Sequence, residues 1–152
     1  MSICLIVPTH NPGSIWPKWI AAVQSQHFAV KCLVVDSTSS DGTDFSSMPI
    51  NWHWLRIKVA DFNHGDTRNL ALQHVPNGTE VVIFMTQDAV LESPDALQLL
   101  LSVFDDPTVA CAYGRQLPHA NATPLAAHAR YFNYPTTSRT ISMADQPRLG
   151  LK

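Results

Sequence analysis

Charged residues are scarce in this sequence. Of its 152 residues, 14% are Asp, Glu, Lys or Arg, and the formal net charge at pH 7 is −2. A surface that binds nucleic acid or another polyanion carries a cluster of Lys and Arg, and this charge balance provides no such excess. We therefore exclude nucleic acid as a partner. Hydrophobic residues reach 45%, which is enough for a sizeable core in one domain and excludes extensive disorder.

Cysteine is rare as well. Cys4, Cys32 and Cys111 stand far apart among apolar neighbours and form neither a CxxC pair nor an even set, which predicts buried free thiols in a reducing compartment. No run approaches the ~20 apolar residues of a membrane-spanning helix. Residues 1–8 lack the basic start and the long apolar stretch of a signal peptide. We expect a cytoplasmic protein that is able to contact the inner face of a membrane peripherally.

Two common ligand-binding patterns are also missing. No GxGxxG sequence follows an apolar run, which argues against a dinucleotide site of the Rossmann type. The seven histidines show no spacing typical of metal ligands, and the cysteines lie elsewhere, so a zinc site is not expected.

Short apolar runs alternate with segments of helical period. The runs predict strands at residues 3–7, 30–35, 53–59, 81–85 and 109–113. Helical spacing predicts helices at residues 16–23, 66–74 and 125–132, and one that starts with Ser93 as N-cap and Pro94 as first residue. This alternation indicates an α/β fold with a mainly parallel sheet. We expect one domain over residues 1–114 and, over 115–152, a proline-punctuated appendage that needs a partner surface.

Polar residues follow three of the predicted strands. They are Pro8-Thr9-His10-Asn11, the serine-rich segment 36–43, and Thr86-Gln87-Asp88. Ligands of open parallel sheets bind beyond the carboxyl ends of the strands, so these segments form the predicted site. Asp36 can accept hydrogen bonds there from a ribose hydroxyl or a base N–H. The alternative is that Asp36 and Asp41 only cap a turn and the following helix.

Asp88 is the candidate metal ligand. It follows the apolar run 81–85 and is expected to project from the centre of the sheet edge. One carboxylate there suits a hard divalent cation such as Mg²⁺ or Mn²⁺, which usually takes one or two carboxylates together with substrate phosphates. The alternative is that Asp88 caps the helix that starts near Pro94, but Asp88 is too far from that start in the sequence for this to explain it well.

A further candidate lies in residues 62–69. This segment combines the imidazole of His64, the N-terminus of a predicted helix and the guanidinium of Arg68, a combination that favours a phosphate. The alternative is a loop in which Asn63 and Asp66 cap the helix and Arg68 is a solvated charge.

In order and spacing, these motifs resemble family 2 glycosyltransferases. The segments that carry the resemblance are VPTHN (7–11), VDSTSSDGT (35–43), FNHGDTRN (62–69) and FMTQDA (84–89). The Asn-His-Gly and Thr-Gln-Asp-Ala versions, with YGRQLP (113–118) and RYFNYP (130–135), are similar to the rhamnosyltransferase branch. The resemblance covers essentially the whole chain. It implies a Rossmann-like GT-A sheet in residues 1–114 and the start of an acceptor-side portion from residue 115.

The resemblance also implies roles for individual residues. The implied donor-binding residues are Pro8, Thr9, Asn11, Asp36, Ser37, Ser39, Asp41, His64, Gly65, Arg68 and Gln87. Asp88 matches the last acid of the metal-binding DXD motif, with Thr86 in place of the first acid, and implies Mg²⁺ or Mn²⁺ as cofactor. Asp66 stands where the branch often has glycine. Arg115 and Gln116 would contact the sugar or the acceptor.

The implied reaction is an inverting displacement. A hydroxyl of a glycan or lipid-linked acceptor attacks the anomeric carbon of a dTDP-sugar, with rhamnose the expected sugar, while the metal stabilises the departing dTDP. The reaction needs a general base near the acceptor, and we expect that base beyond residue 152. We therefore expect this chain to bind the donor, to transfer poorly or not at all, and to self-associate through uncovered apolar surface.

Two other functions compete with this interpretation. The missing base favours a non-catalytic nucleotide-binding or protein-interaction module, whereas the intact donor motifs disfavour it. A nucleotidyltransferase would share the sheet and the metal, but it would need a glycine-rich basic loop after the first strand, and residues 8–11 do not form one.

Overall fold

The computed structural model describes residues 1–150 of the protein. The chain forms two compact units, Met1–Asp105 and Asp106–Lys152, which are described separately. Within residues 1–150, no helix is both long and apolar enough to cross a membrane.

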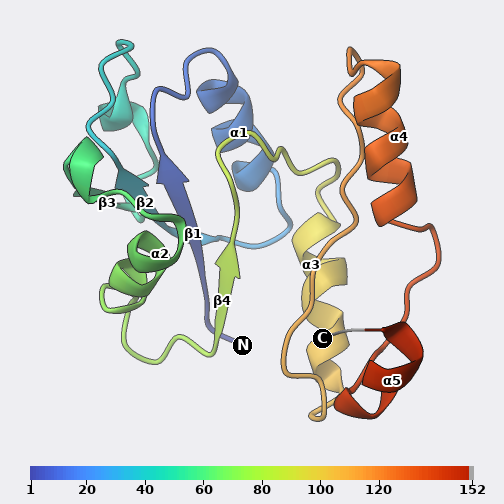
Figure 1. Ribbon diagram of the computed structural model, residues 1–152. Helices are drawn as coiled ribbons and strands as arrows, with labels where there is room; N and C mark the ends of the chain where they lie inside the picture. Colours follow the sequence, from blue (N-terminus) through green and yellow to red (C-terminus); the bar gives the residue numbers. More distant parts are fainter. Residues whose placement is uncertain (151–152) are drawn as a thin grey trace. The chain divides into compact units, whose positions relative to one another are not determined.

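The first unit is built on a parallel sheet (Figure 1). The strands are β1 (Ile3–Thr9), β2 (Lys31–Asp36), β3 (His53–Arg56) and β4 (Val81–Phe84), in the spatial order β3-β2-β1-β4. Each neighbouring pair is parallel. Residues 3–7 of β1 are all buried, as expected for a continuous apolar run in a sheet covered on both faces. The predicted α/β class with a mainly parallel sheet is confirmed.

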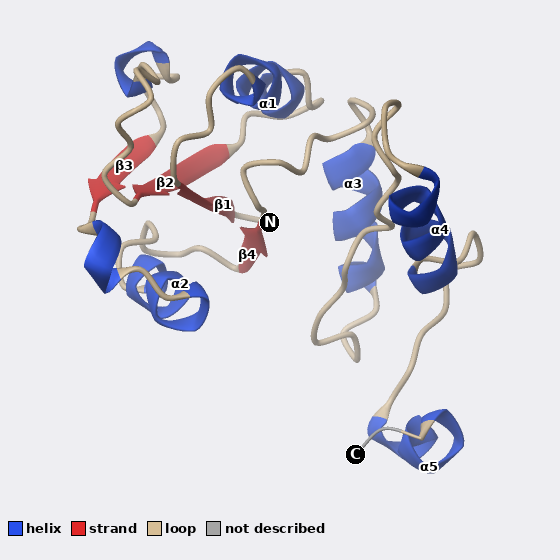
Figure 2. Ribbon diagram, turned by 45° about the horizontal axis from the view of Figure 1, so that its top comes forward, coloured by secondary structure: helices blue, strands red, loops and turns tan. Residues whose placement is uncertain are grey.

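Helices cover both faces of this sheet (Figure 2). The helices of the first unit are α1 (Ile15–Gln24), α2 (His64–Leu72) and α3 (Ala96–Leu101), with 3-10 helices at Phe45–Ser47, Val59–Asp61 and Ser102–Asp105. Leu5 of β1 packs with Trp16 and Trp19 of α1, whose indole rings stack at 5.2 Å. The next residue, Ile6, points to the other face and packs with Ala71 of α2. Because α1 follows β1 and α2 follows β3, both helices begin near the carboxyl ends of the strands.

The second unit contains no strand among residues 106–150. It consists of α4 (Pro124–Asn133), a 3-10 helix at Met143–Asp145 and α5 (Gln146–Leu149). Thr123 is the N-cap of α4: its hydroxyl accepts a hydrogen bond from the Ala126 N–H at 3.3 Å, and Pro124 occupies the first helical position. The helix predicted at residues 125–132 is therefore present, whereas α5 is an addition that the sequence pattern did not predict.

Three sequence predictions, two about strands and one about a thiol, differ from the structure. Residues 109–113 form no strand, because an apolar run becomes a strand only where its backbone pairs with a neighbour, and the described chain provides none there. The predicted strand 53–59 ends at Arg56. Cys4 and Cys32 are buried free thiols as expected, but Cys111 is exposed.

The predicted start of the third helix is also wrong. Ser93 and Pro94 precede α3, which begins at Ala96 with Asp95 as N-cap and without a side-chain capping bond. One N–H in the first turn of α3 is instead satisfied by a residue just after α1, since the side-chain oxygen of Gln26 accepts a hydrogen bond from the Leu97 N–H at 3.0 Å. The second helix begins at His64, two residues before the predicted Asp66.

Candidate functional site

Asp36 is the centre of the polar network where β1 and β2 end. Its side chain is fully buried, next to Thr9, its register partner on β1. One carboxylate oxygen accepts hydrogen bonds from the hydroxyls of Thr9 (3.2 Å) and Ser39, and the other accepts from the Ser39 N–H at 2.9 Å. A carboxylate can be buried only when such donors compensate for lost water. Asp36 therefore shapes the loop after β2, and the turn-forming role considered for it is present.

The loops after β1 and β2 are cross-linked beyond Asp36. The Asn11 N–H donates to the Ser39 hydroxyl at 2.8 Å, and the Asn11 side-chain oxygen accepts from the Ser40 N–H at 2.7 Å. Asn11 has a φ of +47°, and Thr38 has a φ of +53°. Asparagine tolerates this left-handed region, but for β-branched threonine it is an outlier that costs on the order of 1–3 kcal/mol. The Thr38 hydroxyl donates to the Ile57 carbonyl at 2.6 Å, a bond that helps hold the strained conformation.

Asp41 closes the same pair of loops at their outer end. Its carboxylate accepts from the Gly13 N–H at 2.7 Å and from the Thr43 N–H at 3.1 Å. The neighbouring Thr43 hydroxyl, together with these two backbone donors, lowers the pKa of the exposed Asp41 carboxyl below its usual value. Asp41 is therefore a carboxylate at neutral pH, and it ties the start of α1 to the loop after β2.

His10 joins all three strand ends. Its Nδ1 lies 2.9 Å from the Ser37 carbonyl oxygen, which can only accept, so Nδ1 carries the proton. Nε2 then accepts from the Asn11 side-chain amide at 3.3 Å. The His10 N–H donates to the Gln87 side-chain oxygen at 2.7 Å, and the Gln87 amide donates to the His10 carbonyl at 3.0 Å. The sequence analysis included His10 in the predicted site segment but gave it no role of its own, although its position directly after β1 was a sufficient signal.

Asp88 lies beside Gln87 in an exposed turn. The turn is closed by the Ala89 N–H, which donates to the Thr86 carbonyl at 3.1 Å. Within residues 1–150, the Asp88 carboxylate has no hydrogen bond or ion pair, and no group of three His, Cys, Asp or Glu side chains forms a metal cage. This donor set fits a cation held jointly by one carboxylate and a diphosphate, and does not fit a cation held by protein alone.

The start of α2 is already capped by the protein itself. The Asn63 side chain accepts from the N–H groups of Gly65 (2.8 Å) and Asp66 (3.2 Å), as in the capping alternative. Arg68 donates to the His64 carbonyl at 2.6 Å, one turn back in the helix. Neither Gly65 nor Asp66 has a positive φ, so aspartate at position 66 causes no backbone strain.

Arg68 is only partly committed to its own helix. Its guanidinium carbon lies 6.0 Å from the centroid of the Phe84 ring, at the end of β4. A guanidinium has five N–H donors, and within residues 1–150 that of Arg68 makes one hydrogen bond. Arg68 therefore retains donors at the carboxyl edge of the sheet.

The other candidate residues differ in accessibility. Pro8 is a half-buried residue of β1, and Ser37 is buried with a hydroxyl that has no hydrogen-bond partner among residues 1–150. Arg115 and Gln116 belong to the second unit, where Arg115 donates to the Tyr134 carbonyl at 3.2 Å. The structure thus brings together the candidates that follow β1, β2 and β4.

Two hollows flank this edge of the sheet. One of about 500 Å³ lies between α1 and residues 41–47, with Trp16, Ile20, Asp41 and Thr43 in its lining. The other, of about 420 Å³, lies between the end of β3 and the start of α2. Neither of these two hollows is lined by Thr9, Asp36 or Asp88.

Comparison with known proteins gives a consistent result. Residues 4–148 match glycosyl transferase family 2. The O-antigen chain rhamnosyltransferase RfbN of Salmonella typhimurium is 46% identical over 154 residues, covering 100% of this chain and 49% of that protein. WbaN of Salmonella anatum, also an O-antigen chain rhamnosyltransferase, is 42% identical over 153 residues, covering 99% and 48%. The chain spans about half the length of the curated relatives it matches.

Solved structures share the fold at low identity. TarS 1–349 of S. aureus matches with a TM-score of 0.57 and 23% identity over 69% of this chain and 32% of that one. The mannosyltransferase PcManGT of Pyrobaculum calidifontis, in complex with GDP-Man and Mn²⁺, matches with a TM-score of 0.60 and 23% identity over 74% and 36%. These matches confirm the Rossmann-like sheet of glycosyltransferases that the sequence predicts.

Proposed function

The chain belongs to glycosyl transferase family 2, and from this premise we propose that it is the donor-binding portion of a rhamnosyltransferase. Its donor is a dTDP-sugar, and the acceptor is a glycan or a lipid-linked saccharide. The observation that carries the proposal is the 46% identity to an O-antigen chain rhamnosyltransferase over the whole chain. The polar edge built by the ends of β1, β2 and β4 supplies the matching site.

The nucleoside binds at the ends of β1 and β2 in this proposal. Thr9 and Ser39 orient the buried Asp36, and Asn11 is held by Ser40. These fixed positions favour recognition of a base and a ribose, because a group that is already ordered loses little entropy on binding. Ser37 has a buried hydroxyl without a hydrogen-bond partner among residues 1–150, which leaves this group free to bond to a ligand at the same edge.

The diphosphate lies between the start of α2 and the turn that carries Asp88. Arg68, with donors to spare, is the cation for it, next to His64 and Gly65. Asp88 holds Mg²⁺ or Mn²⁺ together with the diphosphate, as its unpaired carboxylate fits. When bound, such a cation neutralises the charge of the departing dTDP.

The transfer itself is an inverting displacement. The oxygen of an acceptor hydroxyl forms a bond to the anomeric carbon of the sugar, the bond from that carbon to the dTDP oxygen breaks, and the hydroxyl proton passes to a general base. We place that base in the half of the relatives that this chain does not span. Arg115 and Gln116 contact the sugar or the acceptor.

The surroundings of the protein are part of the proposal. The unpaired, buried Cys4 and Cys32 favour a cytoplasmic location, with peripheral contact at the inner membrane face for a lipid-linked acceptor. The second unit exposes 79% of Leu125, 78% of Phe132 and 81% of Met143. Exposed apolar surface of this kind favours self-association of the chain. A sedimentation-velocity profile with monomer alone would contradict this.

Calorimetric titration tests the function. We expect dTDP to bind more tightly than UDP or GDP, and to bind more tightly with Mn²⁺ than without it. Nucleotide binding that gains nothing from Mn²⁺ would favour the second candidate, a non-catalytic nucleotide-binding module. Equal or absent binding of all three nucleotides would refute the donor assignment.

A further inference from the structure

The segment between β4 and α3 carries Asp88 and is held at both of its ends. Met85 continues the pairing of β4 with β1, since its N–H donates to the Ile6 carbonyl at 3.0 Å. Met85 and Leu91 pack against the larger core on either side of the exposed turn. The two polar anchors of this segment are the side-chain amides of Gln87 and Gln26, and they differ in what they hold.

Gln87 anchors the turn itself. Its oxygen accepts from the His10 N–H at 2.7 Å and its amide donates to the His10 carbonyl at 3.0 Å. This pair of hydrogen bonds resembles the pairing of two residues in neighbouring strands, and it uses both polar groups of the Gln87 side chain. The Asp88 carboxylate makes no hydrogen bond or ion pair among residues 1–150. Its position relative to β1 therefore depends on the hydrogen bonds of its neighbour Gln87.

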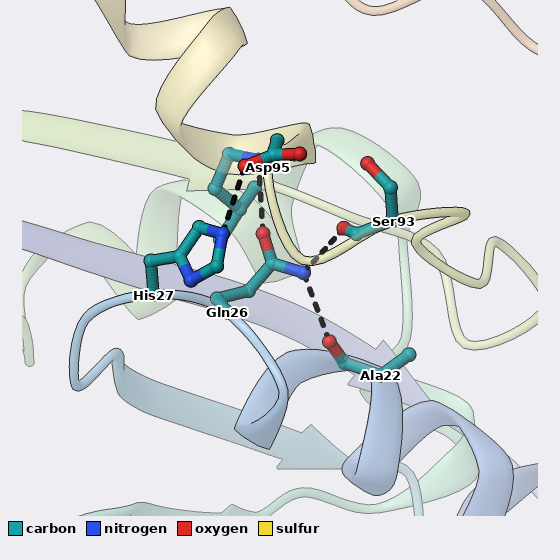
Figure 3. Close-up of polar contacts among 6 residues, drawn as sticks. Ala22, Gln26, His27, Ser93 and Asp95 are labelled. Carbon is teal, nitrogen blue, oxygen red and sulfur yellow. Dashed lines mark hydrogen bonds and ion pairs between the residues drawn. The ribbon is translucent and has the colours of Figure 1, made fainter.

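Gln26 anchors the far end of the segment (Figure 3). Gln26 lies just after α1 and is buried, with an exposed fraction of 6%. Its amide donates to the carbonyls of Ala22 (3.0 Å) and Ser93 (2.9 Å), while its oxygen accepts from the Leu97 N–H. The adjacent His27 contacts Asp95 at 2.8 Å on the surface. This anchor joins Ala22 of α1 to Leu97 of α3, and four residues separate Asp88 from Ser93, the nearest residue in the sequence to which Gln26 is hydrogen-bonded.

We propose that Gln87 is a positioning residue for Asp88, whereas Gln26 stabilises the fold without tuning the metal. The inference rests on the proposed function and deepens it. Gln87 holds the Asp88 turn against His10, so that the carboxylate stays beside the nucleotide edge formed by Thr9, Asn11 and Asp36. The sequence analysis assigned Gln87 to the donor, but both polar groups of its side chain are already hydrogen-bonded to His10. Gln87 therefore acts through Asp88.

The two anchors and an exposed glutamine allow a matched experiment. The variants are Gln87→Met, Gln26→Met and, as control, Gln98→Met on the exposed surface of α3, so that each replaces an amide with an apolar chain of similar length. The full chain is used throughout. Hydrogen exchange of residues 85–92 measures whether the turn is held, and calorimetry measures the ratio of dTDP affinities with and without Mn²⁺.

We expect Gln87→Met to accelerate exchange in residues 85–92 and to lower the Mn²⁺-dependent gain in dTDP affinity about 10-fold to 100-fold, as for other residues that orient a metal ligand. Gln26→Met should lower the melting temperature and keep the metal-dependent gain. Gln98→Met should change neither. If Gln26→Met does not fold, the comparison of Gln87→Met with Gln98→Met decides.

Each remaining outcome counts against a distinct claim. An unchanged metal-dependent gain in Gln87→Met, or unchanged exchange, overturns the positioning role while the wild-type gain leaves the proposed function intact. An equal loss in Gln26→Met shows that the whole segment responds together and also overturns it. Wild-type protein that gains nothing from Mn²⁺ overturns the metal part of the proposed function and the positioning role with it.

Discussion

Asp36→Ala should destabilise the first unit strongly, because the buried carboxylate organises the loop after β2. The variant removes the charged acceptor of the half-buried Ser39 N–H, and a hydrogen bond to a charged group is worth about 1.5–3 kcal/mol. The hydroxyls of Thr9 and Ser39 lose further bonds worth about 0.5–1.5 kcal/mol each. Removing a buried charge offsets part of this loss. We expect a net decrease of about 2–4 kcal/mol in the free energy of unfolding.

Urea unfolding followed by tryptophan fluorescence measures this change. All four tryptophans lie in residues 1–105, so the signal reports on the first unit. With a slope of about 2 kcal/mol per molar urea, the midpoint should fall by about 1–2 M at unchanged slope. Asp61→Ala, at an exposed aspartate of a 3-10 helix, is the control and should change little. An Asp36→Ala protein within about 0.5 kcal/mol of wild type would refute the view that the network holds this loop.

Three further predictions concern the acids and thiols. Asp88→Ala should weaken Mn²⁺-dependent dTDP binding at least about tenfold, which corresponds to about 1.4 kcal/mol, and should leave the melting temperature unchanged. The control is Asp105→Ala, at another exposed acid, which should bind dTDP as wild type does in the same calorimetric titration. The pKa of Asp41 is lower in the folded chain, so its contribution to stability is present above the usual value of 3.8 and is lost as pH falls through the lower folded pKa. In Asp41→Asn, the free energy of unfolding measured in urea should depend less on pH over that acid range. A pH dependence equal to that of wild type would contradict this role. Ellman's reagent should label the exposed Cys111 rapidly and Cys4 and Cys32 only on unfolding, because burial raises the pKa of both inner thiols; labelling of all three at one rate would show that the inner thiols are accessible.

The sequence predicted the elements whose signals are local. β1 and β2 are continuous apolar runs because they are covered on both faces, whereas the run of β4 is only partly buried. The loop after β2 is rich in Asp and Ser because those side chains bond to nearby backbone. Pro17 lies in the first turn of α1, where its missing N–H costs nothing. These features depend on neighbours within a few residues.

The errors arise where distant residues decide the outcome. Ser93-Pro94 has the pattern of a helix start, but the Leu97 N–H in the first turn of α3 is met by Gln26, 71 residues away. The role of Gln87 depends on His10, which is 77 residues away. The apolar run at 109–113 lacks a pairing partner in the described chain. Periodicity and capping rules contain no information about such pairings, so the core of the site was predictable and its supports were not.

Nuclear magnetic resonance of the isotopically labelled chain tests the central claim most directly. On addition of dTDP, the amide signals of residues 9–11 and 36–39 should shift together, and Mn²⁺ should then broaden signals in a zone centred on Asp88. Shifts confined to the hollow between α1 and residues 41–47, or broadening centred away from Asp88, would contradict a donor site at the ends of β1, β2 and β4.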